Sequence, residues 1–221
     1  VGVGANGVGL LTVSNGAKVY STGSQIGATT AGRGDVLITG PTSTWEIVGD
    51  SRYFYVPGSS SGGSTGYNSL VVSNGGTLRM KGSSCAFTIG AGTSNRDSEV
   101  ILTGSNSVMD LGSNGVVVGY ARGHRLSVLD GAQFRAGVVN LGWGSGSNCT
   151  VLVNGAGTVF ALTNELSVGA NSVSNTMIVS GGACVYSGAA GSVGGGGHSN
   201  LMVVTGAGSI WSNRAPLRVG S

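Results

Sequence analysis

The chain has 221 residues, of which 44 are glycine, 40% are hydrophobic and only 9% are charged. The glycine share without a Gly-X-Y period excludes collagen, and the low charge together with this apolar share excludes a disordered chain. The net charge is +3 with the basic residues spread out, so we expect no nucleic-acid partner. No apolar run approaches the roughly 18 residues of a membrane span.

Apolar segments of three to five residues, bounded by Gly, Ser, Asn and Asp, follow one another along the chain, as in Leu70-Val71-Val72. This pattern predicts many short strands and few helices. Eight segments end at a glycine: Gly16, Gly40, Gly75, Gly104, Gly131, Gly155, Gly182 and Gly206. Their separations of 24 to 35 residues are too short for propeller blades and suit the coils of a solenoid. We therefore predict an all-β fold, a right-handed parallel β-helix of about eight coils, as a single domain over residues 1–221.

The eight segments alternate between two types, which gives four two-coil repeats. The first type, such as LTVSNGAKVYS from Leu11, has inward apolar residues three and five before the glycine and three after it. The next residue points outward, and these residues form a candidate contact strip: Tyr20, Arg79, Arg135 and Tyr186.

The second type, such as MVVTGAGSIWS from Met202, has a hydroxyl residue three after the glycine and a large side chain five after it. The hydroxyl residues are Ser43, Ser107, Thr158 and Ser209, and the large residues are Trp45, Met109, Phe160 and Trp211. The large residues are either core packing or an exposed aromatic strip. A further short strand closes each segment with an aliphatic residue and a glycine, from Val3-Gly4 to Val219-Gly220.

This alternation resembles the tandem β-helical repeat of bacterial autotransporter passengers and related secreted surface proteins. The resemblance rests on VTGAGSIW at 204–211, VNGAGTVF at 153–160, LTVSNGAKV at 11–19 and LVVSNGGTL at 70–78. It implies export to the bacterial cell surface or the extracellular space, usually without catalysis. Cell-surface glycans or a host surface are the partners expected on this basis.

Few residues are suited to catalysis or metal binding. Glu46 and Asp110 occupy the same repeat position about 10 Å apart. They either mimic the carboxylate pair of an inverting glycosidase or are solvated rim residues. His124 and His198 lie three coils apart and cannot share a metal ion. We expect no catalytic residue, no metal site and no cofactor, and a polysaccharide lyase or hydrolase is the remote alternative.

Three cysteines, Cys85, Cys149 and Cys184, are odd in number and irregularly spaced, so we expect packing residues and no disulfide framework. Asn148 begins an Asn-Cys-Thr sequon, which we read as chance in a bacterial protein.

Both ends of the chain are as apolar as its internal coils, whereas natural solenoids finish in a polar capping repeat. The apolar end residues are Val3, Val8, Leu10, Leu11, Ile210, Leu217 and Val219. The chain starts at Val1 without Met, which indicates a processed or excised piece. Because Val3-Gly4 and Val219-Gly220 are equivalent points of the repeat, we expect copies to associate head to tail as subunits of a surface fibre. The alternative is a passenger segment of an autotransporter-type adhesin.

Overall fold

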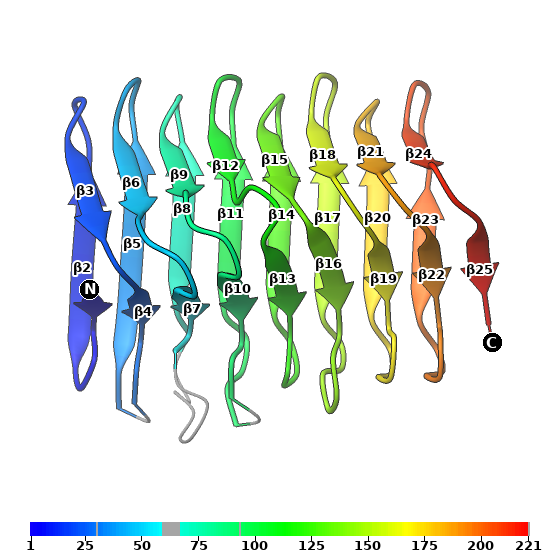
Figure 1. Ribbon diagram of the computed structural model, residues 1–221, viewed down its shortest axis with the longest axis horizontal. Coiled ribbons are helices and arrows are strands. Elements are labelled where there is room, and N and C mark those ends of the chain that lie inside the picture. Colours follow the sequence, from blue (N-terminus) through cyan, green and yellow to red (C-terminus); the bar gives the residue numbers. More distant parts are fainter. Residues whose placement is uncertain (30, 59–66, 93, 221) are drawn as a thin grey trace.

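The computed structural model describes residues 1–29, 31–58, 67–92 and 94–220. These residues form 25 strands and no helix, arranged in three parallel sheets. The chain visits the three sheets in turn and then starts the next coil beside the previous one, so the coils line up along one long axis with the termini at opposite ends (Figure 1). The predicted all-β parallel β-helix of about eight coils is confirmed.

Sheet A carries the short strand that closes each coil. It has nine strands: β1 (Gly2–Val3), β4 (Ser24–Ile26), β7 (Tyr53–Val56), β10 (Ala86–Ile89), β13 (Gly115–Val118), β16 (Val138–Leu141), β19 (Leu166–Val168), β22 (Gly191–Val193) and β25 (Leu217–Val219).

Sheets B and C hold the strands before and after the anchor glycines. Sheet B contains β2 (Val8–Val13), β5 (Arg33–Thr39), β8 (Ser69–Ser73), β11 (Glu99–Thr103), β14 (Arg125–Leu129), β17 (Thr150–Asn154), β20 (Thr176–Ser180) and β23 (Leu201–Val204). Sheet C contains β3 (Lys18–Ser21), β6 (Thr44–Ile47), β9 (Thr77–Met80), β12 (Val108–Asp110), β15 (Gln133–Ala136), β18 (Val159–Leu162), β21 (Cys184–Ser187) and β24 (Ile210–Asn213).

The core is a set of stacked apolar ladders that run through the coils. In sheet B, Val100 lies between Leu70 and Leu126, and all three side chains are fully buried. Strand residues alternate in direction, so the inward positions expected from the glycine spacing are confirmed wherever a coil has neighbours on both sides. The large residues Trp45, Met109 and Phe160 are also fully buried, which confirms core packing and contradicts an exposed aromatic strip.

Candidate functional site at the coil ends and outer faces

The two ends of the solenoid expose strand edges and apolar side chains. At one end, β2 and β3 are the edge strands, and Val8 and Leu10 are 83% and 76% exposed. At the other end, β23, β24 and β25 are all edge strands. The exposed apolar residues there are Leu201, Val204, Ile210, Leu217 and Val219. Unpaired edges with apolar side chains are a template for further strands.

One of the predicted end residues differs from the rest. Val3 is buried, because β1 pairs with β4 and places Val3 against Ile26. Sheet A at this end is therefore already covered by a two-residue strand, while the edges of sheets B and C remain open.

Inward residues of both end coils pack on the core from one side only. Leu11 and Val19 in the first coil, and Met202 and Trp211 in the last, contact the core but are only partly buried. Their counterparts in internal coils, such as Leu70 and Phe160, are fully buried because a coil lies on each side. The end coils therefore lack one neighbour each.

One of the outward rows of sheet B has an unusual distribution of polarity. Successive strands place these residues side by side: Leu10, Asp35, Ser69, Glu99, Arg125, Thr150, Thr176 and Leu201. The six internal positions are polar, and leucine occurs only at the two ends of the row. The neighbouring outward row is apolar in most internal coils, with Leu37, Val71, Ile101, Leu152 and Ile178, so outward apolar residues are not confined to the ends of the sheet. Within the row from Leu10 to Leu201, the two terminal leucines are the exposed apolar positions that another apolar side chain could cover.

The two coil types differ in how the anchor glycine is hydrogen-bonded. In each first-type coil, the N–H of the glycine donates to a hydroxyl of the following second-type coil. The pairs are Gly16 with Ser43 (3.0 Å), Gly75 with Ser107 (3.0 Å), Gly131 with Thr158 (2.8 Å) and Gly182 with Ser209 (3.0 Å). The hydroxyls at this repeat position therefore satisfy partly buried backbone donors, a role that the sequence pattern does not by itself explain.

In second-type coils the glycine N–H donates instead to a backbone carbonyl of the next first-type coil. The pairs are Gly40 with Ser73, Gly104 with Leu129 and Gly155 with Ser180, at 3.2–3.3 Å. Gly206, in the last coil, is the fourth glycine of this kind, and no following coil exists for it among the described residues. In the first coil of the chain, the carbonyl at the corresponding repeat position is that of Ser14, which accepts only the Ala17 N–H of its own turn in the bonds described.

The candidate contact strip points outward as expected, but its members are not adjacent. Strands of the second coil type lie between them and contribute alternating residues to the row: Tyr20, Glu46, Arg79, Asp110, Arg135, Ala161, Tyr186 and Ser212. Opposite charges on neighbouring strands attract each other, so the row is partly self-neutralised. Arg79 separates Glu46 from Asp110, and Lys81 Nζ lies 3.2 Å from Glu46 Oε1, so these two carboxylates do not form an isolated pair.

A line of buried polar side chains fills the corner before sheet B. In several coils, the side chain at this corner accepts the backbone N–H at the same corner of the preceding coil. The Gly34 N–H donates to Asn68 Oδ1 (2.8 Å), the Ser98 N–H to His124 Nδ1 (3.3 Å), and the Cys149 N–H to Asn175 Oδ1 (3.0 Å). The glycines that close sheet A strands make room for these side chains. A Cβ at Gly90 would lie 2.2 Å from His124 Nε2, so only glycine fits there.

Burial at this corner shifts two titratable groups. It lowers the pKa of His124 to about 4, although Asp97 nearby opposes the shift. It also raises the pKa of the Cys149 thiol to about 11, so this cysteine is unreactive at neutral pH. All three cysteines are free, and Cys85 and Cys149 are buried, as expected for packing residues.

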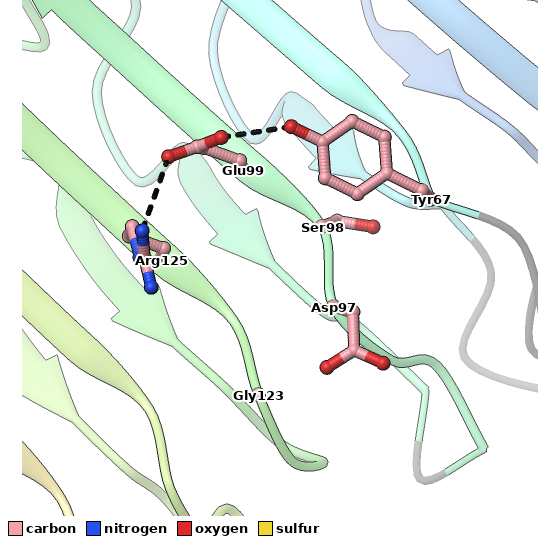
Figure 2. Close-up of a pocket in the computed structure, with 6 residues that line it drawn as sticks. All are labelled: Tyr67, Asp97, Ser98, Glu99, Gly123 and Arg125. Atoms are coloured by element: carbon pink, nitrogen blue, oxygen red, sulfur yellow. Dashed lines mark hydrogen bonds and ion pairs between the residues drawn. The ribbon is translucent and has the colours of Figure 1, made fainter.

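A polar pocket of about 250 Å³ opens beside this corner on the outer face of sheet B (Figure 2). The Tyr67 hydroxyl donates to Glu99 Oε2 at 2.7 Å, and Arg125 Nη1 lies 3.9 Å from Glu99 Oε1. Partial burial, followed by the hydrogen bond and the charge of Glu99, raises the pKa of Tyr67 to about 12. Tyr67 is therefore protonated at neutral pH, and its proton is directed at Glu99, which does not suit a tyrosine base.

Among the described residues, no group of three or more His, Cys, Asp or Glu side chains is arranged to hold a metal ion. Within the same part of the chain, no helix is long and apolar enough to cross a membrane. No family model, curated protein or solved structure matches the chain.

Proposed function

We propose that the chain is a non-enzymatic structural rod that associates head to tail through its end coils. The observation that carries this proposal is one outward row of sheet B, the row from Leu10 to Leu201, in which leucine replaces polar residues only at the two ends. Inside the chain, Val151 of a second-type coil pairs with Met177 of the following first-type coil, and Met177 lies five residues before Gly182. The same register sets Met202 against Leu11 of a second copy, and therefore Leu201 against Leu10.

This register also matches the inward faces. It sets Trp211 on Val19 of the next copy, as Phe160 lies on Val185 inside the chain. Trp211 and Val19, which are only partly buried in the single chain, would then each have a neighbouring coil on both sides. The Gly206 N–H meets the Ser14 carbonyl, and the polar strand edges are paired. The contact joins two different surfaces at opposite ends of the rod, and stacking along its long axis does not bring the ends together into a ring, so the contact repeats and produces a filament.

Following the resemblance to passenger repeats, we further propose that this filament is displayed outside a bacterial cell. A second candidate is a segment of an adhesin passenger, in which further coils of one chain cover the ends. The observation favouring it is β1, a closing strand placed where a coil preceding the first would have one. In either case the outer rows of sheets B and C would provide the contact surface for glycans or a host surface.

Sedimentation velocity over a concentration series tests the proposed association. We expect the chain to form assemblies that grow with concentration, and Leu201→Asp to disperse them because a charge would lie against Leu10 of the next copy. Thr176→Asp is the matched control, since it adds the same charge to an internal position of the same row. Combining Leu10→Lys with Leu201→Asp should restore association. A chain that stays monomeric at high concentration would contradict the proposal.

A further inference from the structure

The three sheets do not contain the same number of strands. Among the described residues, sheet A has nine strands, whereas sheets B and C have eight each. The additional strand is β1, which lies on β4 at the outer edge of the first coil. In a head-to-tail stack, sheet B of one copy pairs with sheet B of the next, and sheet C with sheet C. Sheet A then has one strand too many at the junction.

The two strands that compete are β1 of one copy and β25 of the other. In β1, Val3 pairs with Ile26, and the Gly27 N–H donates to the Val3 carbonyl at 2.8 Å. In β25, Val219 pairs with Val193, one coil earlier, with the same parallel register. Val219 thus occupies the repeat position of Val3. The carbonyl of Val219 would accept an N–H from a following coil, as the Val3 carbonyl accepts the Gly27 N–H.

The free edge of β25 fits the site on β4 better than β1 does. β1 is two residues long and buries only the side chain of Val3. β25 has three residues, and Leu217 and Val219 both lie on the inward side and are exposed. Leu217 would take the place of Val1, which is half-exposed where it stands. The exchange exposes Val3 and the covered half of Val1, and it covers the larger aliphatic surface of Leu217 and Val219.

We propose that β25 of one copy replaces β1 of the next when the copies stack. This inference rests on the proposed head-to-tail association. β1 then serves as a removable cover for the edge of β4 in the unassembled chain. If β1 stayed in place, β25 would stack on β1. The end strands of sheet B in the two copies, and likewise those of sheet C, would then be held apart by one additional layer of about 4.8 Å. Leu201 and Trp211 could then not reach Leu10 and Val19.

A disulfide that fixes β1 to β4 tests the exchange. Gly2 and Gln25 are paired residues with outward positions, and a Cβ at Gly2 meets nothing closer than 3.8 Å. Paired strands bring Cα atoms about 4.8 Å apart, within the range that a disulfide spans. In a Cys184→Ser background, which removes the half-buried thiol, we expect the Gly2→Cys/Gln25→Cys variant to lose assembly when oxidised. Reduction should restore it. Unchanged assembly of the oxidised variant would overturn the exchange.

Intermolecular cross-linking separates failure of the exchange from failure of the association. Arg218 lies at the repeat position of Gly2, so in an exchanged junction it is next to Gln25 of the other copy. We expect Arg218→Cys to form a disulfide ladder of linked chains with Gln25→Cys and none with Gly2→Cys. A ladder that forms with Gly2→Cys and not with Gln25→Cys would show that β25 adds to β1. That result would overturn the exchange and leave the association intact. Dispersed chains without either ladder would contradict the association, and the exchange with it.

Discussion

The buried histidine at the corner of the fifth coil should make the stability of the rod depend on pH. His124 is fully buried, its Nδ1 accepts the Ser98 N–H, and its Nε2 has no partner among the described residues. Its pKa is about 4 in the folded chain and 6.5 in a free side chain. Between these values the unfolded chain binds a proton that the folded chain does not, so stability falls as the pH is lowered from 6.5 to 4 and changes no further through this group below 4.

The size of this effect follows from the difference between the two pKa values. One pKa unit corresponds to 1.36 kcal/mol, so His124 should contribute a loss of about 3 kcal/mol between pH 6.5 and pH 4. The chain itself supplies the control, because Asn68, Asn175 and Asn200 fill the same corner in other coils. His124→Asn should keep the hydrogen bond to the Ser98 N–H and remove the proton linkage.

Urea unfolding of both proteins at several pH values measures the effect. Carboxylates contribute equally to both, so the difference between them isolates His124. We expect the two stabilities to separate progressively below pH 6.5, with the wild type losing more, and His198→Asn to behave like the wild type because His198 is exposed. Parallel pH profiles for wild type and His124→Asn would refute the assignment of a buried neutral imidazole.

Three further outcomes are expected from single substitutions. Thr158→Val should cost about 1 kcal/mol in urea unfolding, because the partly buried Gly131 N–H loses its acceptor, whereas Thr158→Ser should keep most of that stability; equal stabilities of the Val and Ser variants would argue against the hydroxyl's role. Val153→Asp should unfold the chain as measured by circular dichroism, since an unpaired charge in the core costs several kcal/mol, while Leu152→Asp on the outer face should fold. Glu99→Gln should lower the pKa of Tyr67 from about 12 towards 10 in a spectrophotometric titration, and an unchanged value would show that burial alone sets it.

The periodic part of the fold was predictable from the sequence because each coil repeats the same physical problem. A glycine turn, alternating aliphatic residues and a closing aliphatic-glycine pair recur from Gly16 to Gly206, and they determine which side chains point inward. The direction of Tyr20 and Arg79 followed from the same alternation. Their separation by Glu46 depends on the register between the two coil types, which the repeat pattern within each type does not determine.

The features that lie between coils become visible only in the three-dimensional structure. The corner that joins Gly90 to His124 brings together residues from different coils whose local sequences differ, so no repeat pattern marks it. The pocket between Tyr67 and Glu99 likewise depends on a contact across neighbouring coils. The repeat pattern marks Val3 and Val219 as equivalent positions, but only the pairing of β1 with β4 shows that both would occupy one place in a stack.

Electron microscopy of the purified chain tests the head-to-tail association most directly. Eight strands per copy in sheets B and C, about 4.8 Å apart, predict fibres with an axial repeat of about 38 Å in which every junction continues all three sheets. A repeat of about 43 Å would mean that β1 stays in place and adds a ninth layer. Dispersed rods with both end coils open to solvent, at concentrations where the fibres should form, would contradict the association itself.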